Sequence, residues 1–191
     1  MQDEIRISLM ASRQVMDDML ADSALQQTLL HAVDRCVTSL NTGGKLLFAG
    51  NGGSAAEAQH FSAEMVGRFL KERRPLPAIA LNTDTSALTA IGNDYGYDQV
   101  FARQVEALGN AGDVLIVMST SGRSKNIVEA MLVARRKGVV TIALTGLHPR
   151  DMGELADVVL KVPSSHTPQI QEGHLVLGHL LCALVENRIL Q

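Results

Sequence analysis

Short apolar runs alternate with stretches of helical periodicity along most of the chain, from residue 45 to residue 189. The apolar runs are four or five residues long, as in buried strands, and the stretches between them repeat their apolar positions every three or four residues, as in helices. This alternation favours parallel pairing, because each parallel crossover needs a connecting segment that a helix supplies. The pattern predicts an α/β fold, a doubly wound five-stranded parallel sheet with ligands at the carboxyl ends of its strands. The predicted strands are 45–49, 78–81, 114–118, 140–144 and 158–162, and the predicted helices are 54–70, 85–92, 98–108, 122–137, 151–156 and 168–189.

The first 42 residues carry no strand pattern and predict two helices. Ile5 and Leu9 begin the apolar face of the first helix, and a second helical run from 25 to 40 follows Asp22-Ser23 as its cap. The apolar faces of these helices cover either the sheet or a partner subunit, and the pattern leaves both open. We expect a single domain over 1–191, made of an N-terminal two-helix extension at 1–42 and an α/β core at 43–191.

Composition and charge narrow the classes of function. The net charge is −3 and no basic stripe is present, so a nucleic-acid binder is disfavoured. The N-terminus lacks the pattern of a signal peptide, and no apolar run approaches the roughly 18 residues of a membrane span. The two cysteines, Cys36 and Cys182, are expected to be buried, reduced thiols. These features predict a cytoplasmic protein that binds neither nucleic acid nor membrane.

A glycine-rich loop follows the first predicted strand and leads directly into a helix. Its sequence, Gly50-Asn51-Gly52-Gly53-Ser54, brings backbone N–H groups close to a ligand at the positive end of the helix. With Ala55 it also fits the dinucleotide pattern G-x-G-x-x-A. Because the second strand ends at Asn82 instead of the acidic residue that binds ribose, a nicotinamide cofactor is disfavoured.

A hydroxyl-rich loop follows the third predicted strand. Four hydroxyl groups and a glycine at a strand-to-helix turn suit a phosphate monoester, because hydroxyl and amide donors meet the positive end of the helix. The alternative is an N-cap with additional turn residues, which needs fewer hydroxyls. The absence of a Walker lysine disfavours a nucleoside triphosphate. The four hydroxyl residues are Ser119, Thr120, Ser121 and Ser124.

Candidate metal ligands and acid–base groups lie on two predicted helices. His60 and Glu64 are spaced i,i+4, which puts both on one face, where they share a metal, share a substrate proton or form a surface pair. On the last helix, Gln171 and His179 are eight residues apart, about 12 Å along a regular helix. One metal reaches both only if the helix start is irregular, if both side chains lean inward, or if one of them comes from another subunit.

A further polar segment follows the second predicted strand. Asn93 and Asp94 lie in Gly92-Asn93-Asp94-Tyr95-Gly96, whose composition predicts a turn. Composition alone leaves open whether the two side chains form an Asx turn or contact a ligand.

Taken together, these motifs are similar to those of a known family. AGNGGSAAEAQHFSAE at 49–64, LTAIGNDYGY at 88–97, STSGRS at 119–124 and TPQIQEGHLVLGH at 167–179 resemble the sugar isomerase (SIS) domain family, specifically the sedoheptulose 7-phosphate isomerases, also called phosphoheptose isomerases. The resemblance covers essentially all 191 residues. It implies a SIS-type, flavodoxin-like sheet, a cytoplasmic homotetramer, and one Zn²⁺ per subunit.

The resemblance also implies a reaction and roles for individual residues. The reaction converts sedoheptulose 7-phosphate into D-glycero-D-manno-heptose 7-phosphate through an enediol, as the first step of bacterial ADP-heptose and lipopolysaccharide-core synthesis. Glu64 and His179 would be the acid–base pair, and the zinc ligands would be His60, Glu64, Gln171 and His179. The substrate would be bound by Asn51, Gly52, Gly53, Ser54, Glu64, Asn93, Asp94, Ser119, Thr120, Ser121, Ser124 and Gln171.

The main alternative is a non-catalytic SIS-domain regulator that binds a phosphosugar. The initiator-associating proteins, which bind the replication initiator DnaA, resemble this chain but lack a glutamate at the position of Glu64. The presence of that glutamate favours the enzyme. The chain departs from the family pattern at 147–151, where Leu-His-Pro-Arg-Asp replaces a glycine-rich stretch, and we assign that loop no role.

Overall fold

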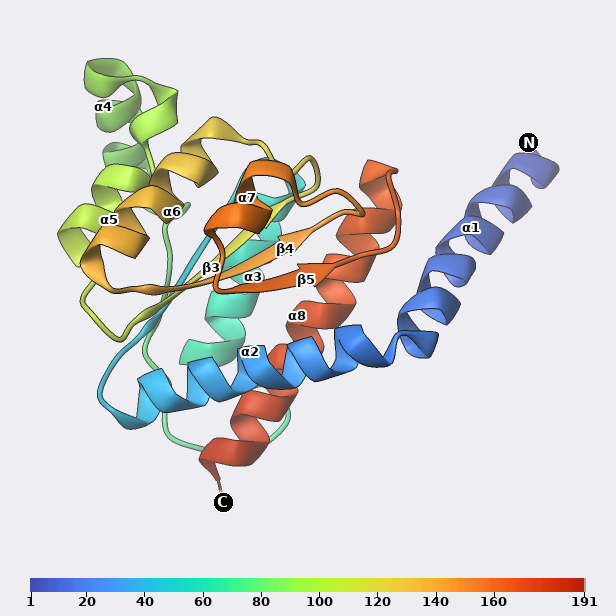
Figure 1. Cartoon of the computed structure of the whole chain (residues 1–191), viewed down its shortest axis with the longest axis horizontal. Helices are drawn as coiled ribbons and strands as arrows, with labels where there is room; N and C mark the ends of the chain where they lie inside the picture. Colours follow the sequence, from blue (N-terminus) through green and yellow to red (C-terminus); the bar gives the residue numbers. More distant parts are fainter. Residues whose placement is uncertain (191) are drawn as a thin grey trace.

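The computed structural model describes residues 1–190 and contains the predicted parallel sheet at the centre of the molecule (Figure 1). The strand order is β2-β1-β3-β4-β5, and every neighbouring pair is parallel. The fold class predicted from the hydrophobic pattern is therefore confirmed. The strands are β1 (Leu46–Gly50), β2 (Ala78–Ala80), β3 (Val114–Ser119), β4 (Val140–Thr145) and β5 (Val158–Lys161).

Helices cover both faces of the sheet because alternate strand residues point to opposite sides. Leu46 and Phe48 of β1 enter a core cluster with α2, α3 and α8, whereas Leu47 and Ala49 enter a second cluster with α5, α6 and α7. The helices are α1 (Gln2–Ala21), α2 (Ser23–Asn41), α3 (Gly53–Val66), α4 (Thr85–Tyr95), the 3₁₀ turn η1 (Tyr97–Gln99), α5 (Ala102–Leu108), α6 (Lys125–Lys137), α7 (Arg150–Leu155) and α8 (Thr167–Ile189).

The two N-terminal helices behave differently. Asp22 caps α2 as predicted, since its side chain accepts the N–H of Leu25 at 2.9 Å, and α2 packs on the sheet and on α8. By contrast, the N-terminal part of α1 extends away from the body of the molecule (Figure 1), where Ile5 and Leu9 remain exposed, whereas Val15 and Met19 in its second half are buried. Within residues 1–190, no helix combines the length and the apolar character that a membrane span needs.

Several helix boundaries differ from the prediction. The helix predicted at 98–108 is divided into the 3₁₀ turn η1 and the helix α5, which begins at Ala102. The helix predicted at 54–70 ends at Val66, and the chain then forms an irregular connection to β2. The helix predicted at 122–137 begins at Lys125, because Gly122 has a φ of +67°, which a right-handed helix excludes. The helix predicted at 85–92 continues to Tyr95, because the residue with positive φ that ends it is Gly96.

Candidate active site

The seam between α3 and α8 carries the candidate metal ligands and acid–base residues. Both helices begin at the carboxyl ends of strands and pack closely side by side (Figure 1). A side chain at Gly178 of α8 is excluded, because its Cβ would lie 2.0 Å from the ring of Phe61 of α3. This close approach lets side chains from the two helices meet.

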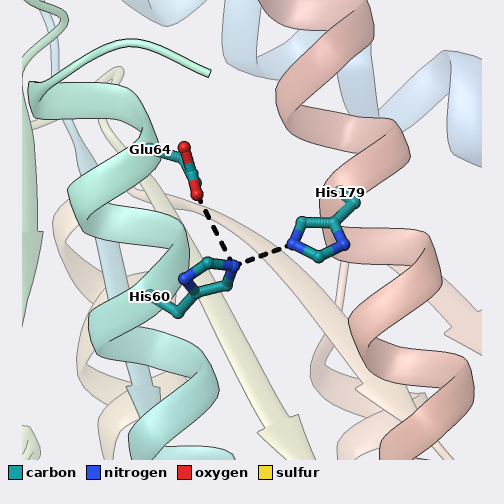
Figure 2. Close-up of side chains that lie close together, drawn as sticks. All are labelled: His60, Glu64 and His179. Atoms are coloured by element: carbon teal, nitrogen blue, oxygen red, sulfur yellow. Dashed lines mark hydrogen bonds and ion pairs between the residues drawn. The ribbon is translucent and has the colours of Figure 1, made fainter. Parts of the chain in front are cut away.

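His60, Glu64 and His179 form a cluster on this seam (Figure 2). The Nε2 atoms of the two histidines are 2.8 Å apart, and His60 Nε2 is 3.6 Å from Glu64 Oε1. One ligand atom from each residue lies within 4.8 Å of the others. Two imidazole nitrogens and a carboxylate oxygen are the donors of many catalytic zinc sites, and the His60 side chain is 43% exposed, which leaves room for a further ligand. The cluster therefore fits a zinc ion.

Gln171 lies elsewhere on α8. Its amide packs against Gly53, where an added Cβ would come within 2.4 Å of the Gln171 Nε2 atom. Because α8 is regular from Thr167 onward, Gln171 and His179 of one chain are separated by about 12 Å. The irregular helix start considered above is therefore not found. The role of Gln171 as a zinc ligand stays a prediction, which depends on both side chains leaning inward or on a residue from another subunit.

The glycine-rich loop is held by amide side chains. Asn51 and Asn126 exchange two hydrogen bonds, of 2.9 and 2.8 Å, and the Tyr97 hydroxyl donates to Asn51 Oδ1 at 2.9 Å. Asn82, which replaces the ribose-binding acid, donates to the carbonyl of Gly50 at 2.7 Å. The sequence did not single out Asn126 or Tyr97, because their contacts depend on partners 75 and 46 positions away.

The hydroxyl-rich loop brings its serines together. Ser119 Oγ lies 3.4 Å from Ser121 Oγ and 2.9 Å from Ser124 Oγ. Ser124 is the N-cap residue of α6, yet its side chain makes no capping hydrogen bond. The hydroxyls therefore converge on one another instead of serving the helix end, which favours the phosphate interpretation over the simple N-cap.

The two loops face a common hollow of about 280 Å³ at the carboxyl ends of β1 and β3. Most of the predicted substrate-binding residues line it. The predicted residues among its lining are Asn51, Gly52, Gly53, Ser54, Ser119, Thr120, Ser124 and Gln171.

Asn93 and Asp94 do not lie in a turn, which corrects the prediction made from composition. Both belong to the last turn of α4, where they are exposed, and Asn93 Nδ2 donates to Asp94 Oδ1 at 2.8 Å. Asp84 starts this helix by accepting the N–H of Ala87, and the helix continues until Gly96. The assignment of Asn93 and Asp94 to the substrate stays a prediction.

A buried imidazole and a partly buried carboxyl group form a pair on the same seam, one turn beyond the hollow. Glu57 Oε2 is 4.0 Å from His174 Nδ1, and His174 is fully buried. Burial raises the pKa of Glu57 to about 7, which the Ser54 hydroxyl partly opposes. Burial lowers the pKa of His174 to about 4, and the nearby Thr145 backbone partly opposes this shift. Neither ring nitrogen of His174 has a partner with hydrogen-bond geometry. Both side chains are therefore largely neutral at intermediate pH.

The fold is that of a SIS domain. Residues 10–146 match the family model of the SIS domain. A phosphoheptose isomerase from Burkholderia pseudomallei is 56% identical over 182 residues, which cover 95% of this chain and 92% of that relative. Solved phosphoheptose isomerases from Neisseria gonorrhoeae and Francisella tularensis each cover 97% of this chain and 98% of their own, with TM-scores of 0.91 and 0.93 at 43% and 40% identity.

The chain belongs to the phosphoheptose isomerase family of SIS-domain proteins. The resemblance inferred from the four motifs is confirmed, and so is the prediction of an enzyme, because the family is one of isomerases. The same fold, at 19% identity, occurs in a Vibrio vulnificus protein complexed with ManNAc-6P, so the fold by itself does not select the reaction.

Proposed function

We propose that this protein isomerises sedoheptulose 7-phosphate to D-glycero-D-manno-heptose 7-phosphate with the help of zinc. The observation that carries the proposal is the cluster of His60, Glu64 and His179 on the helix seam that also lines the hollow between the two loops. Phosphoheptose isomerases at 56% identity make a heptose phosphate the expected substrate. The cluster includes the glutamate that distinguishes the enzymes from the initiator-associating proteins in the resemblance described above.

The two loops bind and orient the substrate in this proposal. The hydroxyls of Ser119, Ser121 and Ser124 converge at the start of α6 and donate to the phosphate there, where the positive end of a 13-residue helix adds to their effect. The amide of Asn51, fixed by Asn126, meets the hydroxyls of the sugar. Holding the phosphate at one end places the carbonyl end at a defined distance along the seam.

Proton transfer is assigned to Glu64 and His179. Conversion of a ketose to an aldose moves a proton between two neighbouring carbons through an enediol, and one group acts on each side of that transfer. His60 and His179 share a short contact, so the imidazoles hold each other in place without substrate. When bound, a zinc ion held by His60, Glu64 and His179 would polarise the carbonyl and stabilise the enediolate charge. The cytoplasmic homotetramer with one zinc per subunit, and the place at the start of heptose synthesis, belong to the same proposal.

The test is direct conversion. Purified protein is incubated with sedoheptulose 7-phosphate, with and without a strong chelator, and the products are separated to detect the aldose phosphate. We expect conversion that the chelator abolishes and added zinc restores. Absence of conversion in the presence of zinc would overturn the proposed reaction, and full conversion in the presence of the chelator would overturn the role of zinc alone.

A further inference from the structure

The connection between α3 and β2 contains a buried ion pair with α8. Arg73 Nε donates to Glu186 Oε1 at 3.0 Å, and each side chain is only 1% exposed. The pair joins positions 113 residues apart in the sequence. It lies at the end of the α3–α8 seam that holds the metal cluster.

The Glu186 carboxylate is fully used as an acceptor. Besides Arg73, it accepts the backbone N–H groups of Phe69, Leu70 and Lys71 at 3.1, 2.8 and 2.9 Å. Burial by itself raises the pKa of Glu186, but these N–H groups and the Arg73 charge outweigh it, so the pKa lies below its ordinary value. A carboxylate with four donors fixes the backbone of 69–71 onto α8.

The Arg73 guanidinium closes the end of α3. Its Nη2 atom donates to the carbonyl of Glu64 at 2.8 Å, and its Nη1 atom donates to the carbonyls of Met65 and Gly67 at 3.0 and 3.3 Å. Carbonyls in the last turn of a helix have no partner within the helix, so the guanidinium satisfies groups that otherwise need water. One of these carbonyls belongs to a residue of the metal cluster.

The same network reaches the other side of the cluster through Phe69. The ring of Phe69 stacks on the imidazole of His179, with centroids 5.4 Å apart and planes inclined by 13°. Glu186, which holds the Phe69 backbone, follows His179 on α8 by about two turns. One buried ion pair therefore fixes the Glu64 backbone, the ring that packs on His179, and the spacing between the two helices.

We propose that Arg73 and Glu186 are positioning residues that hold Glu64 and His179 in the arrangement that binds metal. This inference rests on the proposed function for the identity of the metal. A purely stabilising role does not explain why the contacts of this network reach both sides of the cluster, since Arg73 holds the Glu64 carbonyl and Glu186 holds the Phe69 backbone. Residues that orient metal ligands typically change metal affinity by about 10- to 100-fold when they are replaced.

A second ion pair in the chain provides a matched control. Asp113 accepts the Lys45 ammonium at 2.6 Å and the backbone N–H groups of Lys45 and Asn110, so it combines a cation and backbone donors as Glu186 does. Asp113 directly precedes β3 and Lys45 directly precedes β1, so this pair lies at the amino ends of the strands, opposite the hollow. Asp113→Asn and Glu186→Gln therefore remove comparable charges at the two ends of the molecule.

The experiment measures zinc affinity by competition with a chromogenic chelator, and melting by circular dichroism, in the full-length protein. We expect Glu186→Gln and Arg73→Lys to lower zinc affinity by about 10- to 100-fold, and Asp113→Asn to lower the melting temperature with zinc affinity unchanged.

A metal-independent measurement separates this inference from the proposed function. Stacking on Phe69 shifts the ring proton resonances of His179, and we expect Glu186→Gln to reduce that shift in zinc-free protein. If Glu186→Gln matches wild type in both zinc affinity and the His179 ring shift, the positioning role is overturned. It is also overturned if Asp113→Asn lowers zinc affinity as much as Glu186→Gln does. If wild type binds no zinc, the metal-assisted function fails, and the ring shift alone decides whether Arg73 and Glu186 position His179.

Discussion

His60 of α3 and His179 of α8 bring their Nε2 atoms to 2.8 Å, although 119 residues separate them in the sequence. At that distance the N–H of one imidazole donates a hydrogen bond to the ring nitrogen of the other. Glu64 Oε1 lies 3.6 Å from the same His60 nitrogen. A cation that replaces the proton of this hydrogen bond finds three donors already gathered, which is why the metal and acid–base roles converge on these residues.

Replacing either proposed proton-transfer residue should abolish most turnover. We expect Glu64→Gln and His179→Ala to lower kcat by about 10²- to 10⁴-fold, the usual contribution of a general acid or base. Circular dichroism should show an intact fold, since the side chains of both residues lie at the partly exposed end of the seam. Turnover near the wild-type rate in either variant would remove that residue from the mechanism.

Gln171 should contribute less to zinc binding than His60. Its amide is neutral and, within one chain, packs on Gly53 about two turns from His179. We expect Gln171→Ala to keep more zinc than His60→Ala after dialysis against the same zinc buffer, while still impairing isomerisation. Metal analysis of the two purified variants decides the order, and equal loss of zinc would contradict it.

Ser124→Ala should raise KM more than it lowers kcat. The hydroxyl does not cap α6 and lies 2.9 Å from that of Ser119, where, in the proposed function, it would hold the phosphate equally in the ground and transition states. An interaction that is uniform along the reaction appears mainly in KM. Steady-state kinetics with sedoheptulose 7-phosphate measures both constants, and a fall in kcat at constant KM would speak against a phosphate-holding role.

The pair Glu57 and His174 should give opposite pH dependences of stability. His174 has a folded pKa of about 4 against an ordinary 6.5, so the unfolded chain binds more protons between these values and stability rises with pH there. Glu57 has a folded pKa of about 7 against an ordinary 4.5, so the folded chain binds more protons and stability falls as pH rises through that window. The two contributions largely cancel in the wild-type protein.

Single variants should expose each contribution in turn. In Glu57→Gln only the His174 contribution remains, so the free energy of unfolding should rise more steeply with increasing pH between pH 4.5 and 6.5 than it does in wild type. In His174→Leu only the Glu57 contribution remains, so the free energy of unfolding should fall with increasing pH over the same range. Urea unfolding at several pH values measures these slopes. Parallel pH profiles for wild type and both variants would show that the two groups titrate normally in the folded protein.

Much of the fold could be predicted from the sequence because it depends on local periodicity. The short apolar runs of the buried strands and the helical periods between them identified all five strands, and Asp22 marked the start of α2. The largest errors fell where a single backbone conformation decides the boundary. The positive φ of Gly122 places the start of α6 later than predicted. The helix α4 ends at Gly96 and not near Gly92, so Asn93 and Asp94 lie in a helix where a turn was predicted.

The sequence by itself also determined that His60 and Glu64 share a face, since a spacing of four on one helix fixes that relationship. Only the tertiary structure decided that His179 joins them and that Gln171, on the same helix, packs on the glycine-rich loop instead. The reason is packing: the absence of a side chain at Gly178 lets Phe61 approach α8, and this contact sets which turns of the two helices face each other. Spacing along one helix contains no information about the register between two, so that part of the site emerged only when the chain folded.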